Sequence, residues 1–164
     1  MAGGIGANAR LQPPVSPFGS VDPAPPAPET ELGGLRARLL DASLPLFERF
    51  QAIFGLRNLK GPDAALALGS AMRSDPSALL RHECAYVLGQ MQQAAAVPDL
   101  VAALRGDENP MVRHEAAEAL GACGGEEIVP ELERALREDP ATEVRDSCHL
   151  ALEHFRYLRD PARF

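Results

Sequence analysis

Residues 80–91 read LRHECAYVLGQM and residues 112–123 read VRHEAAEALGAC, so an Arg-His-Glu motif returns after 32 positions. The first copy is Arg81-His82-Glu83-Cys84-Ala85, and the second is Arg113-His114-Glu115-Ala116-Ala117. The composition predicts fewer than one His-Glu dipeptide by chance. Two copies in register therefore indicate a repeated structural unit.

The same shift of 32 aligns residues well outside the two motifs. Apolar, basic and acidic positions recur in three or four units, and each recurring Asp lies close to a Pro in the sequence. The aligned sets are Ala65/Val97/Val129, Leu68/Leu100/Leu132, Met72/Leu104/Leu136, Arg73/Arg105/Arg137, Asp75/Asp107/Asp139 and Arg49/Arg81/Arg113/Arg145. Each unit therefore reads as a helix, a short Asp/Pro turn and a second helix.

The spacing of apolar residues within a unit is helical. Leu132, Ala135 and Leu136 stand at i, i+3 and i+4, which places them on one helical face. Pro98 and Pro130 suit the first turn of a helix, and Gly89, Gly121 and Gly124-Gly125 suit helix ends. We expect an all-α fold: a solenoid of about four HEAT-like helical hairpins over residues 31–164.

Residues 1–30 have a different composition, rich in Pro and Gly, and include the run Pro23-Ala24-Pro25-Pro26-Ala27-Pro28. Such a segment is expected to be an extended or disordered linker. It has no apolar core of a secretory signal, no membrane span, and too few Arg for a transit peptide. Three Cys without CxxC spacing favour a reducing compartment, so we expect the protein in the cytoplasm.

The net charge of −7 makes nucleic acid an unfavourable partner. A cationic ligand or a basic protein segment is attracted to such a surface instead.

The two His-Glu pairs supply imidazole and carboxylate, which are the ligands of non-haem iron centres. His82 and His114 on adjacent helices can share one ion, and one carboxylate can complete a two-His, one-carboxylate set. The Glu of each pair, Glu83 or Glu115, either joins the ion from the edge or supports the ligands from behind. Fe(II) suits this set, and Zn²⁺ accepts the same ligands.

The pairs are confined to the two central units. Phe50-Gln51 in the first unit and Asp146-Ser147 in the fourth occupy the equivalent positions. A lone His-Glu pair on a solenoid helix is most simply a pair of polar residues on the surface. The repetition of the pair in register is what favours a metal site. The recurring arginines Arg49, Arg81, Arg113 and Arg145 form an Arg ladder along the repeats. This ladder is expected to be structural, with each Arg bridging to the Asp between units.

Other reactive or apolar side chains have simpler interpretations. The cysteines are expected to be small buried residues, and the last two histidines are expected at surface or capping positions. The Met and Phe residues are expected to pack in the core or in a cap. These residues are Cys84, Cys123, Cys148, His149, His154, Met91, Met111, Phe47, Phe50 and Phe54.

Several motifs resemble one enzyme family, deoxyhypusine hydroxylase. Leu80–Met91 and Asn109–Ala122 are similar to two of its inner helices, Ser20–Pro26 is similar to the connector between its halves, and Pro45–Phe50 resembles the start of its second half. The resemblance covers the chain from about Ser20 to the C-terminus, and its motifs are specific to this family among HEAT proteins.

The resemblance implies a HEAT-repeat monooxygenase with a di-iron centre. It implies that O2 is used to hydroxylate the deoxyhypusine side chain of translation initiation factor 5A, which completes hypusine. His82, His114 and Glu115 match Fe(II) ligands, and Glu83 matches an acidic position that binds the substrate amine or iron.

The family builds its centre from four His-Glu pairs, two in each half, whereas this chain carries two. The resemblance therefore implies a C-terminal half-enzyme, which needs a second half or a second copy of itself to complete the centre. The alternatives are a non-catalytic HEAT scaffold that binds a protein, and a HEAT protein of the phycobilin-lyase type, which the paired motifs disfavour.

Overall fold

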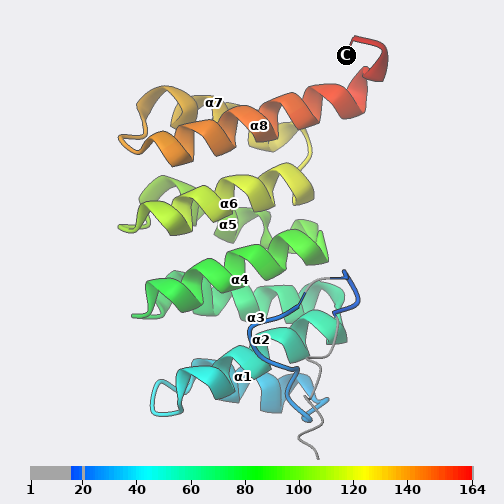
Figure 1. The fold of residues 1–164 in the computed structure, drawn as a ribbon, viewed down its shortest axis with the longest axis vertical. Coiled ribbons are helices and arrows are strands. Elements are labelled where there is room, and N and C mark those ends of the chain that lie inside the picture. Colours follow the sequence, from blue (N-terminus) through cyan, green and yellow to red (C-terminus); the bar gives the residue numbers. More distant parts are fainter. Residues whose placement is uncertain (1–15, 20, 164) are drawn as a thin grey trace, which may run out of the picture.

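The structure is a computed structural model, and it describes residues 16–19 and 21–163. Every helix of this part belongs to an elongated stack, drawn in Figure 1. The α-helices are α1 Leu32–Leu40, α2 Leu46–Leu59, α3 Gly61–Ser74, α4 Ala78–Met91, α5 Val97–Gly106, α6 Pro110–Cys123, α7 Val129–Glu138 and α8 Thr142–Arg159. Short 3-10 turns cover Ala94–Ala96, Glu126–Ile128 and Pro161–Arg163.

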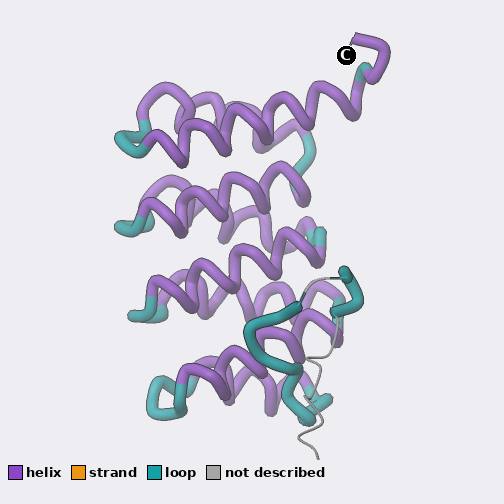
Figure 2. Tube along the Cα trace, in the orientation of Figure 1, coloured by secondary structure: helices purple, strands orange, loops and turns teal. Residues whose placement is uncertain are grey.

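Consecutive helices pair as antiparallel hairpins, and the hairpins stack along the long axis. Helices α2, α4, α6 and α8 form one layer, while α1, α3, α5 and α7 form the other (Figures 1 and 2). Contacts within the first layer join α4 to α6 and α6 to α8. The expected all-α solenoid of four hairpins is confirmed, and both His-Glu motifs fall in one layer.

The turns between paired helices repeat the same local chemistry. Asp75 accepts a hydrogen bond from the amide of Ser77, and Asp107 accepts one from the amide of Asn109, both at 2.9 Å. The Ser77 hydroxyl and the Asn109 amide oxygen then cap helices α4 and α6. The recurring Asp thus fixes the backbone that starts each motif-bearing helix.

Buried ion pairs join one repeat to the next, as the Arg ladder predicted. Arg81 donates to both carboxylate oxygens of Asp107, at 2.7 and 2.9 Å, and also to the carbonyl of Asp75. Arg113 repeats this pattern with Asp139 and the carbonyl of Asp107. These bidentate contacts hold neighbouring hairpins in a fixed register.

Gly89 and Gly121 do not end their helices as predicted, because each lies inside the last turn. A Cβ on Gly89 would stand 3.3 Å from the Cβ of Ala119, and one on Gly121 would stand 2.9 Å from the Cβ of Ala151. Glycine is therefore needed where helices of one layer cross closely. Helix α4 ends instead at Met91, and the capping residue Gln92 adopts a left-handed backbone with φ 51°.

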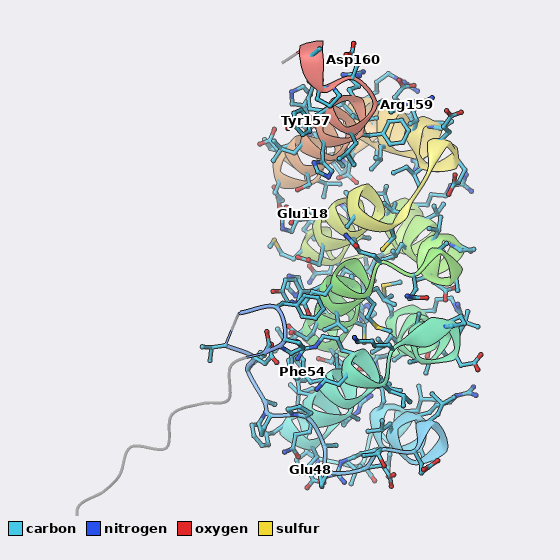
Figure 3. The ribbon with its side chains drawn as sticks, turned by 90° about the vertical axis from the view of Figure 1, so that its right-hand side faces the viewer. Glu48, Phe54, Glu118, Tyr157, Arg159 and Asp160 are labelled. Atoms are coloured by element: carbon cyan, nitrogen blue, oxygen red, sulfur yellow. The ribbon has the colours of Figure 1, made fainter. Side chains whose placement is uncertain are left out.

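The described part of the N-terminal segment is non-helical, as predicted, but it is ordered against helix α2. Asp22 forms a bidentate ion pair with Arg57, and both side chains are almost fully buried. The Arg57 guanidinium also lies over the ring of Phe54, labelled in Figure 3 beside the segment. The prediction of disorder thus fails for this stretch, and for residues 1–15 and 20 it lies outside the described residues.

No helix in the described part of the chain is both long enough and apolar enough to cross a membrane.

Candidate metal centre

The two histidines of the repeated motif meet around one carboxylate. His82 on α4 places Nε2 3.2 Å from Oε2 of Glu115, and His114 on α6 places its Nε2 3.9 Å from the same oxygen. Glu115 is buried, whereas the two imidazoles are about one quarter exposed. The sequence prediction that these three side chains converge on one side of the stack agrees with this geometry.

The site crosses the boundary between two repeats. His82 contacts a residue 33 positions later, and His114 contacts Ser147, also 33 positions later, at 2.7 Å. In the layer of α4, α6 and α8, position n of one helix therefore faces position n+33 of the next helix. This offset explains why the Glu of the second pair, Glu115, faces the His of the first pair, His82.

Glu83 lies near this group but makes none of the ion pairs found among the described residues. Burial raises the pKa of its carboxyl; the charge of His82 acts in the opposite direction, and that of Glu115 adds to the rise. The Asp22–Arg57 pair also acts on it, so the N-terminal segment contributes to the electrostatics around Glu83.

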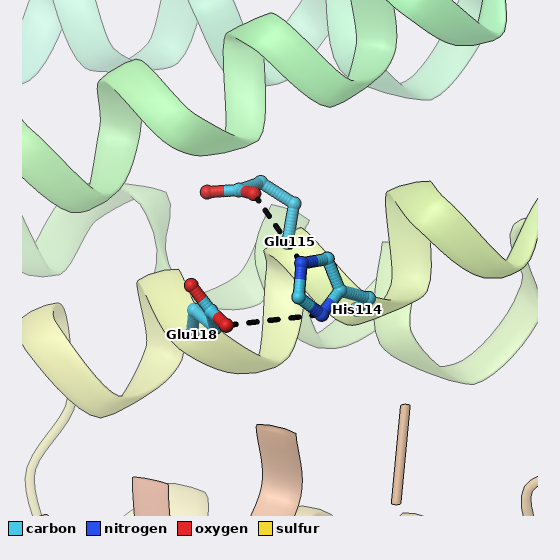
Figure 4. A group of neighbouring side chains, drawn as sticks. All are labelled: His114, Glu115 and Glu118. Carbon is cyan, nitrogen blue, oxygen red and sulfur yellow. Dashed lines mark ion pairs between the residues drawn. The ribbon is translucent and has the colours of Figure 1, made fainter. Parts of the chain in front are cut away.

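His114 lies between two carboxylates, as Figure 4 shows. Its Nε2 side faces Glu115, while its Nδ1 is 3.7 Å from Glu118. The Ser147 hydroxyl lies between Nδ1 and Glu118, donating to Oε1 of Glu118 at 3.3 Å. His114, Glu115 and Glu118 offer atoms within 4.8 Å of one another.

The donor set suits a divalent cation. The hydrogen bond from His82 to Glu115 raises the pKa of His82, with burial acting in the opposite direction. Nδ1 of His82 is buried and has no hydrogen-bond partner. A buried ring nitrogen without a partner is uncommon, but the nitrogen of His82 that faces Glu115 is Nε2. Imidazoles gathered around a carboxylate fit Fe(II) or Zn²⁺.

Sequence reasoning missed Glu118 and Ser147. Glu118 stands four residues after His114, a spacing that places both on one helical face. Ser147 occupies the fourth-repeat position equivalent to Glu115, so its place in the repeat was the one sequence signal that pointed to it. Tyr86 takes the equivalent place after His82, and only the third repeat therefore has the extra carboxylate.

A groove of about 330 Å³ opens beside His82, lined also by Ala78, Leu79, Asn109 and Met111. Met111 is 46% exposed, and Phe47, its counterpart two repeats earlier, is 56% exposed. Neither residue lies in the core, so the prediction of core packing is wrong for both. Phe50 and Phe54 are buried, in agreement with the prediction.

The three cysteines are free, and two of them, Cys84 and Cys148, are buried. Burial raises the pKa of the Cys123 thiol to about 11 and that of Cys148 to about 12. The prediction of small buried residues is confirmed for Cys84 and Cys148, whereas Cys123 is only partly buried.

The stacked hairpins and the imidazole-carboxylate group between two of them define a helical-repeat protein with a candidate metal centre. Residues 65–153 match the HEAT-repeat family, and the chain therefore belongs to that family.

The comparisons narrow the class further. The deoxyhypusine hydroxylase of Gallus gallus is 55% identical over 150 residues, which cover 92% of this chain and 50% of the relative. The human deoxyhypusine hydroxylase is 57% identical over 89 residues, covering 54% of this chain and 29% of the relative.

The solved structure of human deoxyhypusine hydroxylase in complex with glycerol matches with a TM-score of 0.83 and 53% identity, over 89% of this chain and 50% of that one. This chain is thus a homologue of the deoxyhypusine hydroxylases, and it spans at most about half the length of these relatives.

Proposed function

We propose that this chain is the iron-binding C-terminal half of a deoxyhypusine hydroxylase. The observation that carries the proposal is the Glu115 carboxylate, which faces Nε2 of both His82 and His114 across a repeat boundary. The substrate is the deoxyhypusine side chain of translation initiation factor 5A, and the site of action is the cytoplasm. The homology to enzymes of this name supports the substrate.

His82, His114 and Glu115 hold the metal, Fe(II), and a second iron belongs to the complete di-iron enzyme. When bound, iron supplies the activation of O2 that hydroxylation of an unactivated carbon requires. Glu83 is buried beside these ligands and serves to bind the substrate amine or to support the ligands from behind. A cationic side chain is also drawn to a chain of net charge −7.

The half-length chain requires a complement. Either a separate chain with the other pairs or a second copy related by a two-fold axis completes the centre, because an isologous interface presents one patch twice. Like-charged carboxylates gathered on an open face repel one another unless a cation or a cationic partner compensates them.

The test is anaerobic Fe(II) loading of the purified chain, followed by addition of the deoxyhypusine-bearing factor and O2. The molecular mass of the assembly formed by the chain and the amount of hypusine produced are measured in the same sample. Stoichiometric iron with a metal-dependent dimer that forms hypusine supports the proposal. A monomer that is active at full rate would contradict the half-site assignment.

The second candidate is a protein-binding scaffold, favoured by the exposed apolar side chains Phe47, Leu79 and Met111 at equivalent positions of three repeats. A chain that binds no stoichiometric iron, and whose properties are indifferent to His82→Ala, would favour this scaffold over the enzyme.

A further inference from the structure

His114 has a second set of contacts, on the side of the ring away from Glu115. Nδ1 lies 2.7 Å from the Ser147 hydroxyl, which in turn lies 3.3 Å from Oε1 of Glu118. Ser147 comes from α8 and Glu118 from α6, so two helices of one layer build the contact. Figure 4 shows Glu118 and Glu115 on opposite sides of the ring.

The direction of these hydrogen bonds follows from the hydrogens available. A serine hydroxyl has one hydrogen, and an ionised carboxylate only accepts. When Ser147 donates its hydrogen to Glu118, its oxygen is left to accept from Nδ1–H of His114. The other ring nitrogen, Nε2, then carries a lone pair, which points to the side of Glu115.

We propose that Ser147 and Glu118 are positioning residues that hold His114 as the Nδ1–H tautomer and leave Nε2 open for a ligand. The part of this inference that assigns a metal to Nε2 rests on the proposed function. Histidine ligands usually donate their second N–H to a carboxylate, carbonyl or water, which fixes tautomer and ring orientation. Free histidine favours the opposite tautomer, so the protein must impose this one.

The lone pair of Nε2 and the Glu115 oxygen, 3.9 Å apart, are both acceptors in this arrangement. A divalent cation placed between them would be attracted by both atoms, because imidazole nitrogen and carboxylate oxygen are both metal ligands. His82 shows the contrast, because its Nδ1 has no partner and its hydrogen bond to Glu115 places the ring proton on Nε2, the nitrogen that faces the carboxylate. His114 is therefore the preorganised ligand of the pair.

Burial sets the relative importance of the two positioning residues. Ser147 is 3% exposed, so water does not replace its hydroxyl, whereas the side chain of Glu118 is 48% exposed. Loss of Ser147 should accordingly change the tautomer more than loss of Glu118.

The experiment is two-bond 15N–1H correlation on the full, metal-free chain labelled with 15N histidine, at alkaline pH where the rings are neutral. We expect the Nδ1–H form of His114 in the unsubstituted chain. Ser147→Ala and Glu118→Ala should shift it toward Nε2–H, and Ser147→Thr, which keeps the hydroxyl, should restore it. Glu138→Ala, at the end of α7 in the other layer, is the control.

An Nε2–H ring in the unsubstituted chain, or a tautomer unaffected by both alanine variants, would overturn the inference. The second readout is the dissociation constant for Zn²⁺, which should rise about 10- to 100-fold in Ser147→Ala. Equal Zn²⁺ affinity in both chains contradicts the positioning role and leaves the proposed function standing. The expected tautomers in a chain that binds no metal support the positioning role and count against the proposed function.

Discussion

Glu115 is the residue on which the candidate centre depends, since both imidazoles face one of its oxygens. We expect Glu115→Gln, which keeps the shape and removes the charge, to weaken Fe(II) binding by more than about 100-fold, because loss of an outer hydrogen bond alone reaches that size. Anaerobic Fe(II) titration measures the affinity, and circular dichroism should show unchanged helicity.

Glu108→Gln is the matched control, because the side chain of Glu108 is 88% exposed. Iron affinity retained in Glu115→Gln, or lost equally in the control, would refute the assignment of Glu115 as a ligand.

Thiol reactivity gives a second prediction at the residue scale. Burial raises the pKa of Cys123 from 9.0 to about 11, and the Cys123 Sγ–H donates to the carbonyl of Leu88. Since only the thiolate reacts, its rate with Ellman's reagent at neutral pH should be about 100-fold lower than in denaturant. The comparison uses Cys84→Ala/Cys148→Ala chains to isolate Cys123; equal rates in the two states would show that the thiol is open.

At the scale of helices, close crossings depend on Gly89 and Gly121. Gly121→Ala places a methyl 2.9 Å from the Cβ of Ala151. Overpacking costs about 1–3 kcal/mol, which outweighs or cancels the gain of about 1 kcal/mol in helix propensity. We therefore expect a lower or unchanged free energy of unfolding in urea.

Gly33→Ala is the control for this prediction, because nothing lies within 4 Å of the added Cβ. That variant should gain stability. If Gly121→Ala gains as much, the crossing of α6 and α8 is not limited by space.

The sequence predicted the helices well because their determinants are local. Apolar spacing, Pro in the first turn of α5 and α7, and the recurring Asp all act within a few residues. The roles of Gly89 and Gly121 could not be predicted in this way, because they depend on the distance between helices far apart in sequence.

The same distinction separates the predicted and unpredicted parts of the site. His82, His114 and Glu115 were predicted because they repeat in the sequence. Ser147 breaks the repeat, and its contact with His114 becomes visible only once the 33-residue offset between stacked helices is known. The sequence repeat therefore identified the candidate ligands, whereas the contact with Ser147 is known only from the way the helices stack.

At the scale of the whole molecule, the Arg113–Asp139 ion pair between two repeats links folding to pH. Burial raises the pKa of Asp139, but the hydrogen bonds from Arg113 and the Ala141 amide outweigh this, and the net pKa is below 3.8. Its stabilising contribution is thus complete above pH 3.8 and is lost as pH falls through the lower folded value.

We therefore expect the unfolding free energy to fall as the pH decreases below 3.8. Asp139→Asn should be less stable at neutral pH, with a flatter profile below pH 4. Urea unfolding at several pH values measures both chains; parallel profiles would show that Asp139 does not carry this dependence.

His82 and Glu115 belong to neighbouring hairpins, so their separation depends on the angle between those hairpins. Solenoids deform by small rotations at each contact between repeats. A rotation of one hairpin against the other therefore changes the distance between the His82 imidazole and the Glu115 carboxylate. An ion bound across the contact resists that movement, so metal occupancy and the mechanical stiffness of the chain rise and fall together.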